Sequence, residues 1–338
     1  MTKAFITGVN GPELSGEEAA FLAAERPAGL ILFTRNCESR EQISRLVATF
    51  KRCVGSDRVL VLIDQEGGRV QRLRPPLSRL LPPAAAYAAL FGDDPVKACA
   101  WARLVARHTA EDLVALGIDT NCVPVLDVPV PGAHDIIGNR AYGTSLDQII
   151  RLGRAVAEGF MAGGVLPVMK HIPGHGRATS DSHLELPVVT QSIEALCSTD
   201  FVPFAALSTL PAAMTAHIVY TALDATEPAS TSRCVIAGIV RGRLGFDGLL
   251  MSDDLSMQAL SGSLGARTSA VLGAGCDLAL HCNGHLDEMR EVAAATPLLD
   301  GMARQRFDRA VAVTHAPRKS YDVDAAERAI ETLLSPQS

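Results

Sequence analysis

The sequence predicts an α/β fold, a (β/α)8 TIM barrel in a single domain, and three observations support this fold class. Eight short runs are apolar along their whole length, as expected for parallel strands whose two faces are both covered. Longer segments of amphipathic helical pattern separate these runs almost from end to end. The length of 338 residues fits one such barrel with extensions. A doubly wound open sheet is the competing architecture, but it usually has fewer strands.

The expected strands follow one another at regular intervals along the chain. Residues 59–64 are typical, because they read VLVLID with no polar residue before the last position. The eight runs are 4–8, 29–33, 59–64, 119–125, 165–171, 212–218, 248–253 and 278–282. Six amphipathic segments lie between them, at 16–26, 40–52, 95–116, 146–162, 232–244 and 265–273. Three more helices, at 285–295, 301–314 and 325–334, are expected to pack outside the barrel. No linker or repeat divides the chain, so residues 1–338 are expected to form one TIM-barrel domain.

Composition narrows the classes of function. Hydrophobic residues make up 48% and charged residues 20%, which is typical of a globular protein with a sizeable core. The net charge of −6 argues against nucleic acid as a partner, because phosphate binding needs a basic surface. No apolar stretch has the length of a membrane span, and no signal peptide is evident. The eight cysteines include no C-x-x-C pair and are expected to be reduced, which indicates the cytoplasm.

Polar side chains gather directly after the expected strands, whereas the strand beginnings carry no comparable cluster. In a TIM barrel the strand ends meet at one face, where active sites are built. This asymmetry predicts an enzyme with one polar pocket. The residues concerned are Asp64, Arg72, Asn139, Arg140, Lys170, His171, Asp181, His183, His217, Asp253 and Asn283.

The segment 170–183 reads KHIPGHGRATSDSH and is the densest in ionisable groups. In an extended loop Asp181 and His183 could lie on one side, so that the carboxylate orients the imidazole and favours its protonated form. A capped polar turn is the alternative. Lys170 and His171 could hydrogen-bond sugar hydroxyls, or form an ion pair at the barrel rim. His175, between two glycines, is expected to hold the loop.

Two adjacent carboxylates, Asp253 and Asp254, close the seventh run. Neighbouring side chains of a strand point to opposite faces, so only one of them is expected to face the barrel mouth, and spacing alone does not choose between them. A nucleophilic carboxylate together with a separate acid/base suits double displacement at the anomeric carbon of a sugar. Arg140 is expected to contact a ligand. A tight turn at Gly67 and Gly68 would carry Arg72 back over the site, although Arg72 could also be solvated. His217 either lines the pocket or packs in the core.

Four long motifs together resemble one family. DQEGGRVQRL (64–73), GNRAYG (138–143), KHIPGHG with DSHLELP (170–187) and FDGLLMSDDLSM (246–257) are similar to the β-N-acetylhexosaminidases of glycoside hydrolase family 3, in particular the bacterial single-domain enzymes of peptidoglycan recycling. The resemblance implies a TIM barrel that removes non-reducing terminal N-acetylglucosamine from fragments such as GlcNAc-1,6-anhydroMurNAc. It also implies that Asp253 is the nucleophile, that His183 is the general acid/base and that Asp181 is its dyad partner. The substrate-binding positions that it implies are Asp64, Arg72, Arg140, Lys170 and His171.

Two rival functions remain open from the residues. A metal-dependent hydrolase could use His171, His175, His183, His217, Asp181 and Asp253 as ligands, although neither an H-x-H pair at a first strand end nor an H-E-x-x-H helix occurs. A non-catalytic sugar-binding protein would explain the basic residues but give Asp253 no role. The family resemblance favours an enzyme without metal or other cofactor. Its expected partner is a small carbohydrate, with no nucleic acid and no membrane, and a monomer is expected.

Overall fold

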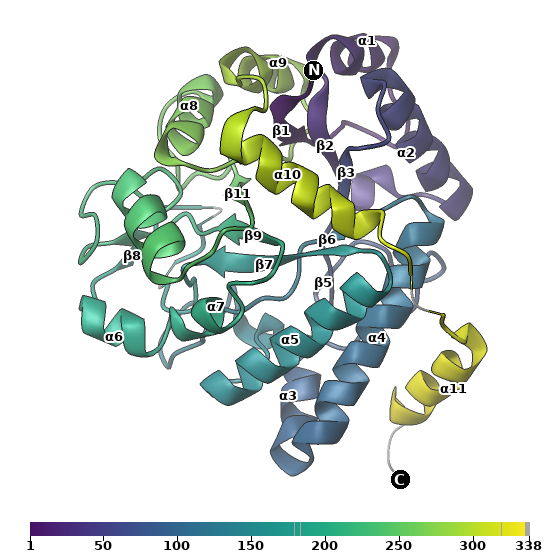
Figure 1. The fold of residues 1–338 in the computed structure, drawn as a ribbon, viewed down its shortest axis with the longest axis vertical. Coiled ribbons are helices and arrows are strands. Elements are labelled where there is room, and N and C mark those ends of the chain that lie inside the picture. The colour runs from purple at the N-terminus through teal and green to yellow at the C-terminus, as the bar shows by residue number, and fades with distance from the viewer. Residues whose placement is uncertain (179, 183, 319, 335–338) are drawn as a thin grey trace.

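The chain forms a closed barrel of parallel strands surrounded by helices, as a computed structural model shows. The structure describes residues 1–178, 180–182, 184–318 and 320–334. Within these residues eight strands close the barrel in the order β1-β12-β11-β9-β7-β6-β3-β2. Figure 1 shows the helices arranged around this ring. The predicted (β/α)8 barrel is confirmed.

The barrel strands agree with the expected runs. Their bounds are β1 Lys3–Thr7, β2 Pro27–Leu32, β3 Leu60–Ile63, β6 Thr120–Asn121, β7 Leu166–Ile172, β9 Ala212–Thr215, β11 Leu249–Asp254 and β12 Leu278–His281. The fourth strand, β6, is shorter than the expected 119–125. The N–H of Val123 donates to the Asn121 carbonyl within the same segment, which interrupts the ladder, and pairing resumes only as one bridge between Val125 and Lys170.

Helices follow most strands on the outside. Their bounds are α1 Gly16–Glu25, α2 Arg40–Val54, α3 Ala84–Asp93, α4 Pro95–Ala115, α5 Leu146–Ala162, α6 Ile193–Ser198, α7 Val202–Ala206, α8 Leu264–Ala274, α9 Leu286–Ala295, α10 Gly301–Thr314 and α11 Val323–Leu334, with a π-helix, η3, at Val235–Arg243. Side-chain caps begin several of them: Ser15 and Glu18 form a capping box at α1, and Ser145 caps α5. The short helices α3, α6 and α7 are not predicted by the amphipathic pattern.

The three C-terminal helices have different positions. Helix α9 takes the place of an outer barrel helix, in contact with α8, α1 and β1. Helix α10 crosses the end of the barrel where the strands begin, and Phe307, Ala310 and Val311 pack there against residues of the barrel interior. Helix α11 lies beside α4 (Figure 1). All three helices therefore pack outside the barrel as expected, and α10 covers the end opposite the polar strand ends.

Apolar side chains fill both faces of the strands. In β1, Ile6 belongs to the cluster inside the barrel, and its neighbour Phe5 belongs to the cluster between strands and helices. Both are fully buried. This two-sided burial is why the strands read as continuous apolar runs.

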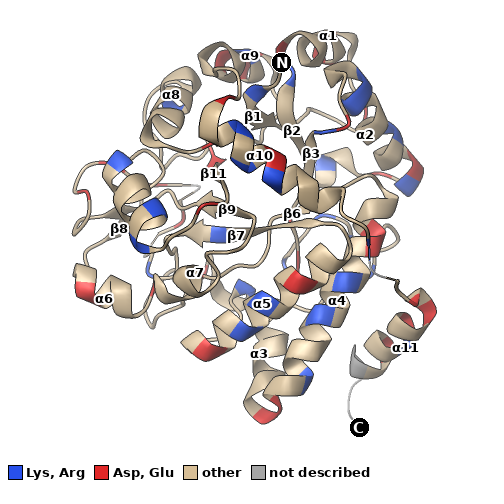
Figure 2. Cartoon of the chain, in the orientation of Figure 1, with Lys and Arg blue, Asp and Glu red and all other residues tan. Residues whose placement is uncertain are grey.

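Charged residues of both signs are interspersed over the outer helices, as Figure 2 shows for one side of the molecule. Among the described residues, no helix has the length and apolar character that crossing a membrane requires.

Candidate active site

Asp64 directly follows β3 and begins a tight hairpin. Strands β4 (Gln65–Gly67) and β5 (Val70–Gln71) pair antiparallel, and the turn between them uses Gly67 and Gly68, both with positive φ (102° and 58°). A Cβ on Gly67 would lie 2.3 Å from the carbonyl oxygen of Pro82, so only glycine fits there. The hairpin carries Arg72 back over the strand end, as the sequence predicts. Its Nη2 lies 2.9 Å from Asp64 Oδ2.

Gln65 fixes this hairpin to the barrel. Its buried side-chain oxygen accepts hydrogen bonds from the backbone N–H groups of Arg72 and Leu73, and its amide nitrogen donates to the Leu73 carbonyl. Its backbone N–H and carbonyl both pair with the side chain of Asn121 on β6. The positions of Asp64 and Arg72 therefore depend on a turn that the hydrogen bonds of Gln65 and Asn121 hold in place.

Five charged side chains of alternating sign form one continuous chain along the cavity wall. We call it the ion-pair chain, and its members in order are Arg72, Asp64, Lys170, Glu66 and Arg140. Lys170 Nζ lies 2.8 Å from Asp64 Oδ1 and 2.7 Å from Glu66 Oε1. Arg140 binds Glu66 through two parallel hydrogen bonds of 2.8 Å each. With three cations and two anions, the ion-pair chain carries a net charge of +1.

The ion-pair chain keeps its members charged despite burial. Burial would raise the pKa of Asp64 and Glu66, but the nearby cations, Lys170 first, outweigh it and hold both pKa values below the usual range. Burial would likewise lower the pKa of Lys170 and Arg140, but Asp64 and Glu66 raise it. The cavity wall therefore presents fixed cations to a ligand.

His171 is oriented by a buried carboxylate, Asp127. The His171 Nδ1 lies 2.7 Å from Asp127 Oδ2, and Asp127 Oδ1 accepts the backbone N–H groups of His171 and His175. Burial would raise the pKa of Asp127, but His171 and His175 lower it to about 2. His175 Nε2 lies 3.2 Å from the hydroxyl of Ser182, so His175 holds the loop as expected. Gly176 is required beside it, since a Cβ there would lie 1.9 Å from the Val128 carbonyl oxygen.

Asp253 and Asp254 both line the cavity, which corrects the expectation that only one faces the barrel mouth. The pairing of β11 with β12 shifts register between Met251 and Asp254, and such a bulge interrupts the alternation of side chains. Their partners differ. Asp253 Oδ1 accepts the N–H of Asp254, whereas Asp254 Oδ1 accepts the N–H groups of Ser256 and Cys282. Asp254 therefore joins the ends of β11 and β12.

His217 is fully buried and supports the same strand end. Its Nε2 lies 3.1 Å from the Asp254 carbonyl oxygen, which can only accept, so Nε2 carries the hydrogen. The Ser230 hydroxyl, 2.7 Å from Nδ1, then donates to the other nitrogen. Burial lowers the pKa of His217, which is consistent with a neutral ring. Of the two roles left open by the sequence, the structure favours packing beneath the cavity.

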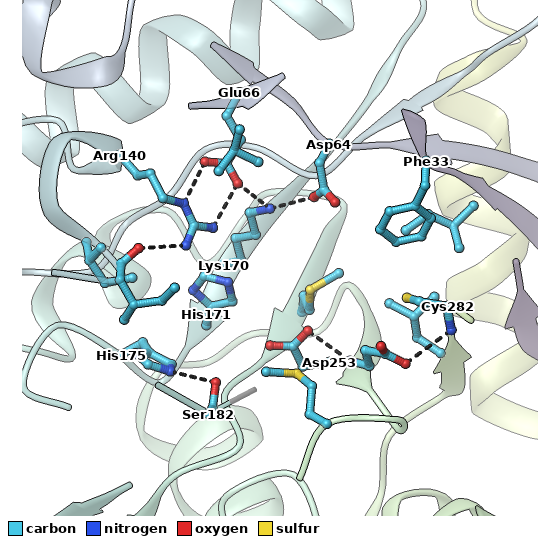
Figure 3. Close-up of a pocket in the computed structure, with 18 of the residues that line it drawn as sticks. Phe33, Asp64, Glu66, Arg140, Lys170, His171, His175, Ser182, Asp253 and Cys282 are labelled. Atoms are coloured by element: carbon cyan, nitrogen blue, oxygen red, sulfur yellow. Dashed lines mark hydrogen bonds and ion pairs between the residues drawn. The ribbon is translucent and has the colours of Figure 1, made fainter. Parts of the chain in front are cut away.

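The ion-pair chain, His171, His175, Asp253 and Asp254 line one cavity of about 290 Å³ at the carboxyl ends of the strands. Strands β3 and β11 lie opposite one another in the barrel ring, so Asp64 and Asp253 enter the cavity from opposite sides. Figure 3 shows Asp253 across the cavity from Asp64 and Glu66, with Lys170 and His171 between them on β7. The apolar part of the lining consists of Ile31, Phe33, Val70, Ile136, Ile137, Met214, Met257, Leu280 and Cys282.

The predicted dyad lies on the loop after β7. Asp181 is half-buried, and its carbonyl oxygen accepts the N–H groups of Leu184 and Glu185, which makes a turn. Its neighbour Ser182 lines the cavity. His183 lies outside the described residues. The pairing of Asp181 with His183 therefore stays a prediction.

Two residues of this site were missed by the sequence analysis, Glu66 and Asp127. Glu66 lies inside the motif that supplies Asp64 and Arg72, where nothing in the spacing distinguishes it. Asp127 had a usable signal, because it is a single carboxylate within the apolar stretch 123–130 after the fourth strand. An isolated carboxylate among apolar residues is buried only when it is paired.

Among the described residues, no group of three or more His, Cys, Asp or Glu side chains is arranged to hold a metal ion.

Comparison with known proteins gives concordant matches. Residues 6–314 match the N-terminal domain of glycosyl hydrolase family 3. A protein of Alkalilimnicola ehrlichii named beta-hexosaminidase is 39% identical over 306 residues, which cover 89% of this chain and 86% of that protein. One of the same name from Tolumonas auensis is 38% identical over 308 residues, 89% of this chain and 87% of that protein. NagZ from Neisseria gonorrhoeae, solved in complex with N-trifluoroacetyl-D-glucosamine, superposes with a TM-score of 0.87 at 31% identity, over 99% of this chain and 98% of that one.

Proposed function

This chain belongs to glycosyl hydrolase family 3 and is a glycosidase, and from this premise we propose that it is a retaining β-N-acetylglucosaminidase. The observation that carries the proposal is the cavity itself. A carboxylate, Asp253, lies on one side of it, and the ion-pair chain with His171 lies on the other. The relatives named beta-hexosaminidase and the neighbour that binds an N-acylated glucosamine support the choice of sugar.

The proposed roles follow from this arrangement. Arg72, Asp64, Lys170, His171 and Arg140 bind the hydroxyl and acetamido groups of the sugar. Charged donors and acceptors with fixed positions bind such groups with little loss of conformational entropy. The anomeric carbon is then held in front of Asp253.

The proposed reaction is a double displacement. In the first step a carboxylate oxygen of Asp253 forms a bond to the anomeric carbon, the bond from that carbon to the leaving oxygen breaks, and His183 gives this oxygen its proton. In the second step neutral His183 takes a proton from water, whose oxygen attacks the anomeric carbon and releases Asp253. The sugar leaves with its configuration retained. Asp181 favours the protonated form of His183.

The proposed substrates are peptidoglycan fragments, GlcNAc-1,6-anhydroMurNAc with or without peptide, from which the enzyme removes the terminal N-acetylglucosamine. This assignment rests on the family resemblance of the motifs 64–73, 138–143, 170–187 and 246–257, and the solved neighbour supports only the N-acylated glucosamine that is removed. We further propose that residues 1–338 act as one catalytic domain and as a monomer in the cytoplasm, in the recycling of cell-wall material.

Hydrolysis of a nitrophenyl N-acetyl-β-glucosaminide tests this function. Wild type should release nitrophenol, and Asp253→Asn should lose almost all of this rate because an amide is a poor nucleophile. The matching glucoside, which lacks the acetamido group, should be a much poorer substrate. Asp247→Asn is the matched control, because Asp247 pairs with Arg306 and Arg309 at the opposite end of the barrel. Equal rates for wild type and Asp253→Asn would contradict the assigned nucleophile.

A further inference from the structure

We infer that Glu66 is a positioning residue that holds Arg140 and Lys170 in the places from which they bind the sugar. The inference deepens the proposed function and rests on it, since both cations are assigned there to sugar binding. Glu66 itself does not need to touch the substrate.

Glu66 occupies the centre of a contact between two cations that come from distant parts of the chain. Arg140 ends a 3-10 turn, η2 (Gly138–Arg140), in the long loop after β6, and Lys170 lies on β7. The Glu66 side chain is 6% exposed, and those of Arg140 and Lys170 are 10% and 3% exposed. Figure 3 shows the carboxylate of Glu66 between the two cationic groups. A loop and a strand are thus joined by one buried anion.

The contacts of Lys170 and Arg140 show how the Glu66 carboxylate holds each of these two side chains. Lys170 Nζ donates a hydrogen bond of 2.8 Å to Asp64 and forms an ion pair of 2.7 Å with Glu66, so these two carboxylates hold the position of the ammonium group. Arg140 uses Nε and Nη2 on Glu66 and Nη1 on the Ile136 carbonyl. A guanidinium has five N–H donors in a planar fork, so the two that remain are directed by the plane that Glu66 imposes.

Loss of the charge on Glu66 would leave two like charges close together in a poorly solvated place. In Glu66→Gln one amide oxygen could still accept a hydrogen bond, but the amide nitrogen would face the other cation. The net charge of the ion-pair chain would rise from +1 to +2. Because a misplacement of about 1 Å in a binding group can cost about 100-fold in rate, the effect of this repulsion on catalysis should be large.

The experiment compares Glu66→Gln with a matched variant, Glu111→Gln. Glu111 also joins two cations, Arg107 and Arg318, but lies on α4 outside the barrel. Both variants should lower the melting temperature. Glu66→Gln should also lower kcat/KM on the nitrophenyl substrate by about 10- to 100-fold and weaken binding of N-acetylglucosamine, measured by calorimetry well below the melting temperature. Glu111→Gln should leave both properties near wild type. If Glu66→Gln lost stability alone, as Glu111→Gln should, the inference would be overturned.

A double-mutant cycle with Arg140→Gln asks whether Glu66 acts through its partner. The fold-decrease in kcat/KM of the double variant should be smaller than the product of the two single fold-decreases. Once Arg140 is gone, the substitution at Glu66 can no longer act by displacing it. Losses that multiply fully would overturn the inference. If the wild type bound N-acetylglucosamine but did not hydrolyse the nitrophenyl substrate, the proposed function would be wrong. The binding data for Glu66→Gln would then still decide the role of Glu66. Wild type that neither hydrolyses nor binds would overturn both.

Discussion

Replacing His175 with glutamine should change how the free energy of unfolding depends on pH. His175 is 3% exposed and holds the loop after β7 through Ser182. Its Nδ1 is buried without a hydrogen-bond partner among the described residues. Burial first, and then the charge of His171, lower the pKa of His175 from 6.5 to about 4. Glutamine can still reach a hydroxyl but does not titrate.

The magnitude follows from the two pKa values. As the pH falls, the unfolded chain takes up a proton on residue 175 near pH 6.5, whereas the folded chain does so only near pH 4. The contribution of neutral His175 to stability is therefore complete above about pH 6.5 and is lost between there and about pH 4. At about 1.4 kcal/mol for each pH unit, this interval corresponds to about 3 kcal/mol.

Urea unfolding at a series of pH values between 4 and 7 measures this effect. The free energy of unfolding of wild type should exceed that of His175→Gln most at pH 7, and the difference should shrink by about 3 kcal/mol at pH 4. Parallel curves for wild type and His175→Gln would refute the reasoning.

Four further outcomes are expected. His183→Ala should lose far less rate on substrates with activated leaving groups than on natural disaccharides, because only the latter need a proton; equal losses in the two assays would argue against the acid role. His217→Phe removes the donor to the Asp254 carbonyl, so urea unfolding should show a loss of about 1–3 kcal/mol and kinetics a lower kcat; an unchanged kcat would mean that this hydrogen bond does not support the site. Asp277→Ala removes the partner of two arginines far from the cavity and should cost about 3–5 kcal/mol of unfolding free energy, with kcat of the folded enzyme unchanged. Activity in the presence of a chelator should equal activity without it, because the proposed mechanism uses no metal; inactivation reversed by added metal would favour the metal-dependent rival.

The barrel could be predicted because its strands are buried on both faces. Residues 59–63, for example, are all apolar, whereas a strand with one face exposed to solvent would alternate apolar and polar residues. Elements of a few residues were missed. The ladder between β8 (Val188–Val189) and β10 (Val219–Tyr220) and helix α7 are too short to show a period. The position of α10 also required the structure, because an amphipathic pattern does not say which surface its apolar face covers.

The cavity side of the site was largely predictable for a similar reason. Asp64 and Arg72 follow β3, and Lys170, His171 and Asp253 lie in the last residues of β7 and β11. Barrel geometry brings these strand ends together. What a residue does there depends on partners that the sequence does not reveal. Glu66 acquires its importance only because Arg140, 74 positions away, folds back onto it. The bulge that turns both Asp253 and Asp254 toward the cavity likewise has no local signature in the sequence.

In the proposed reaction Asp253 forms a covalent bond to the sugar. A 5-fluoro N-acetylglucosaminyl derivative with an activated leaving group keeps the acetamido group and slows the second displacement, so the glycosyl-enzyme should accumulate and its position can be mapped by mass spectrometry of peptides. We expect one added sugar per chain, on Asp253, in the wild type and none in Asp253→Asn. A label on another residue, or turnover of the natural linkage with inversion of configuration, would contradict it.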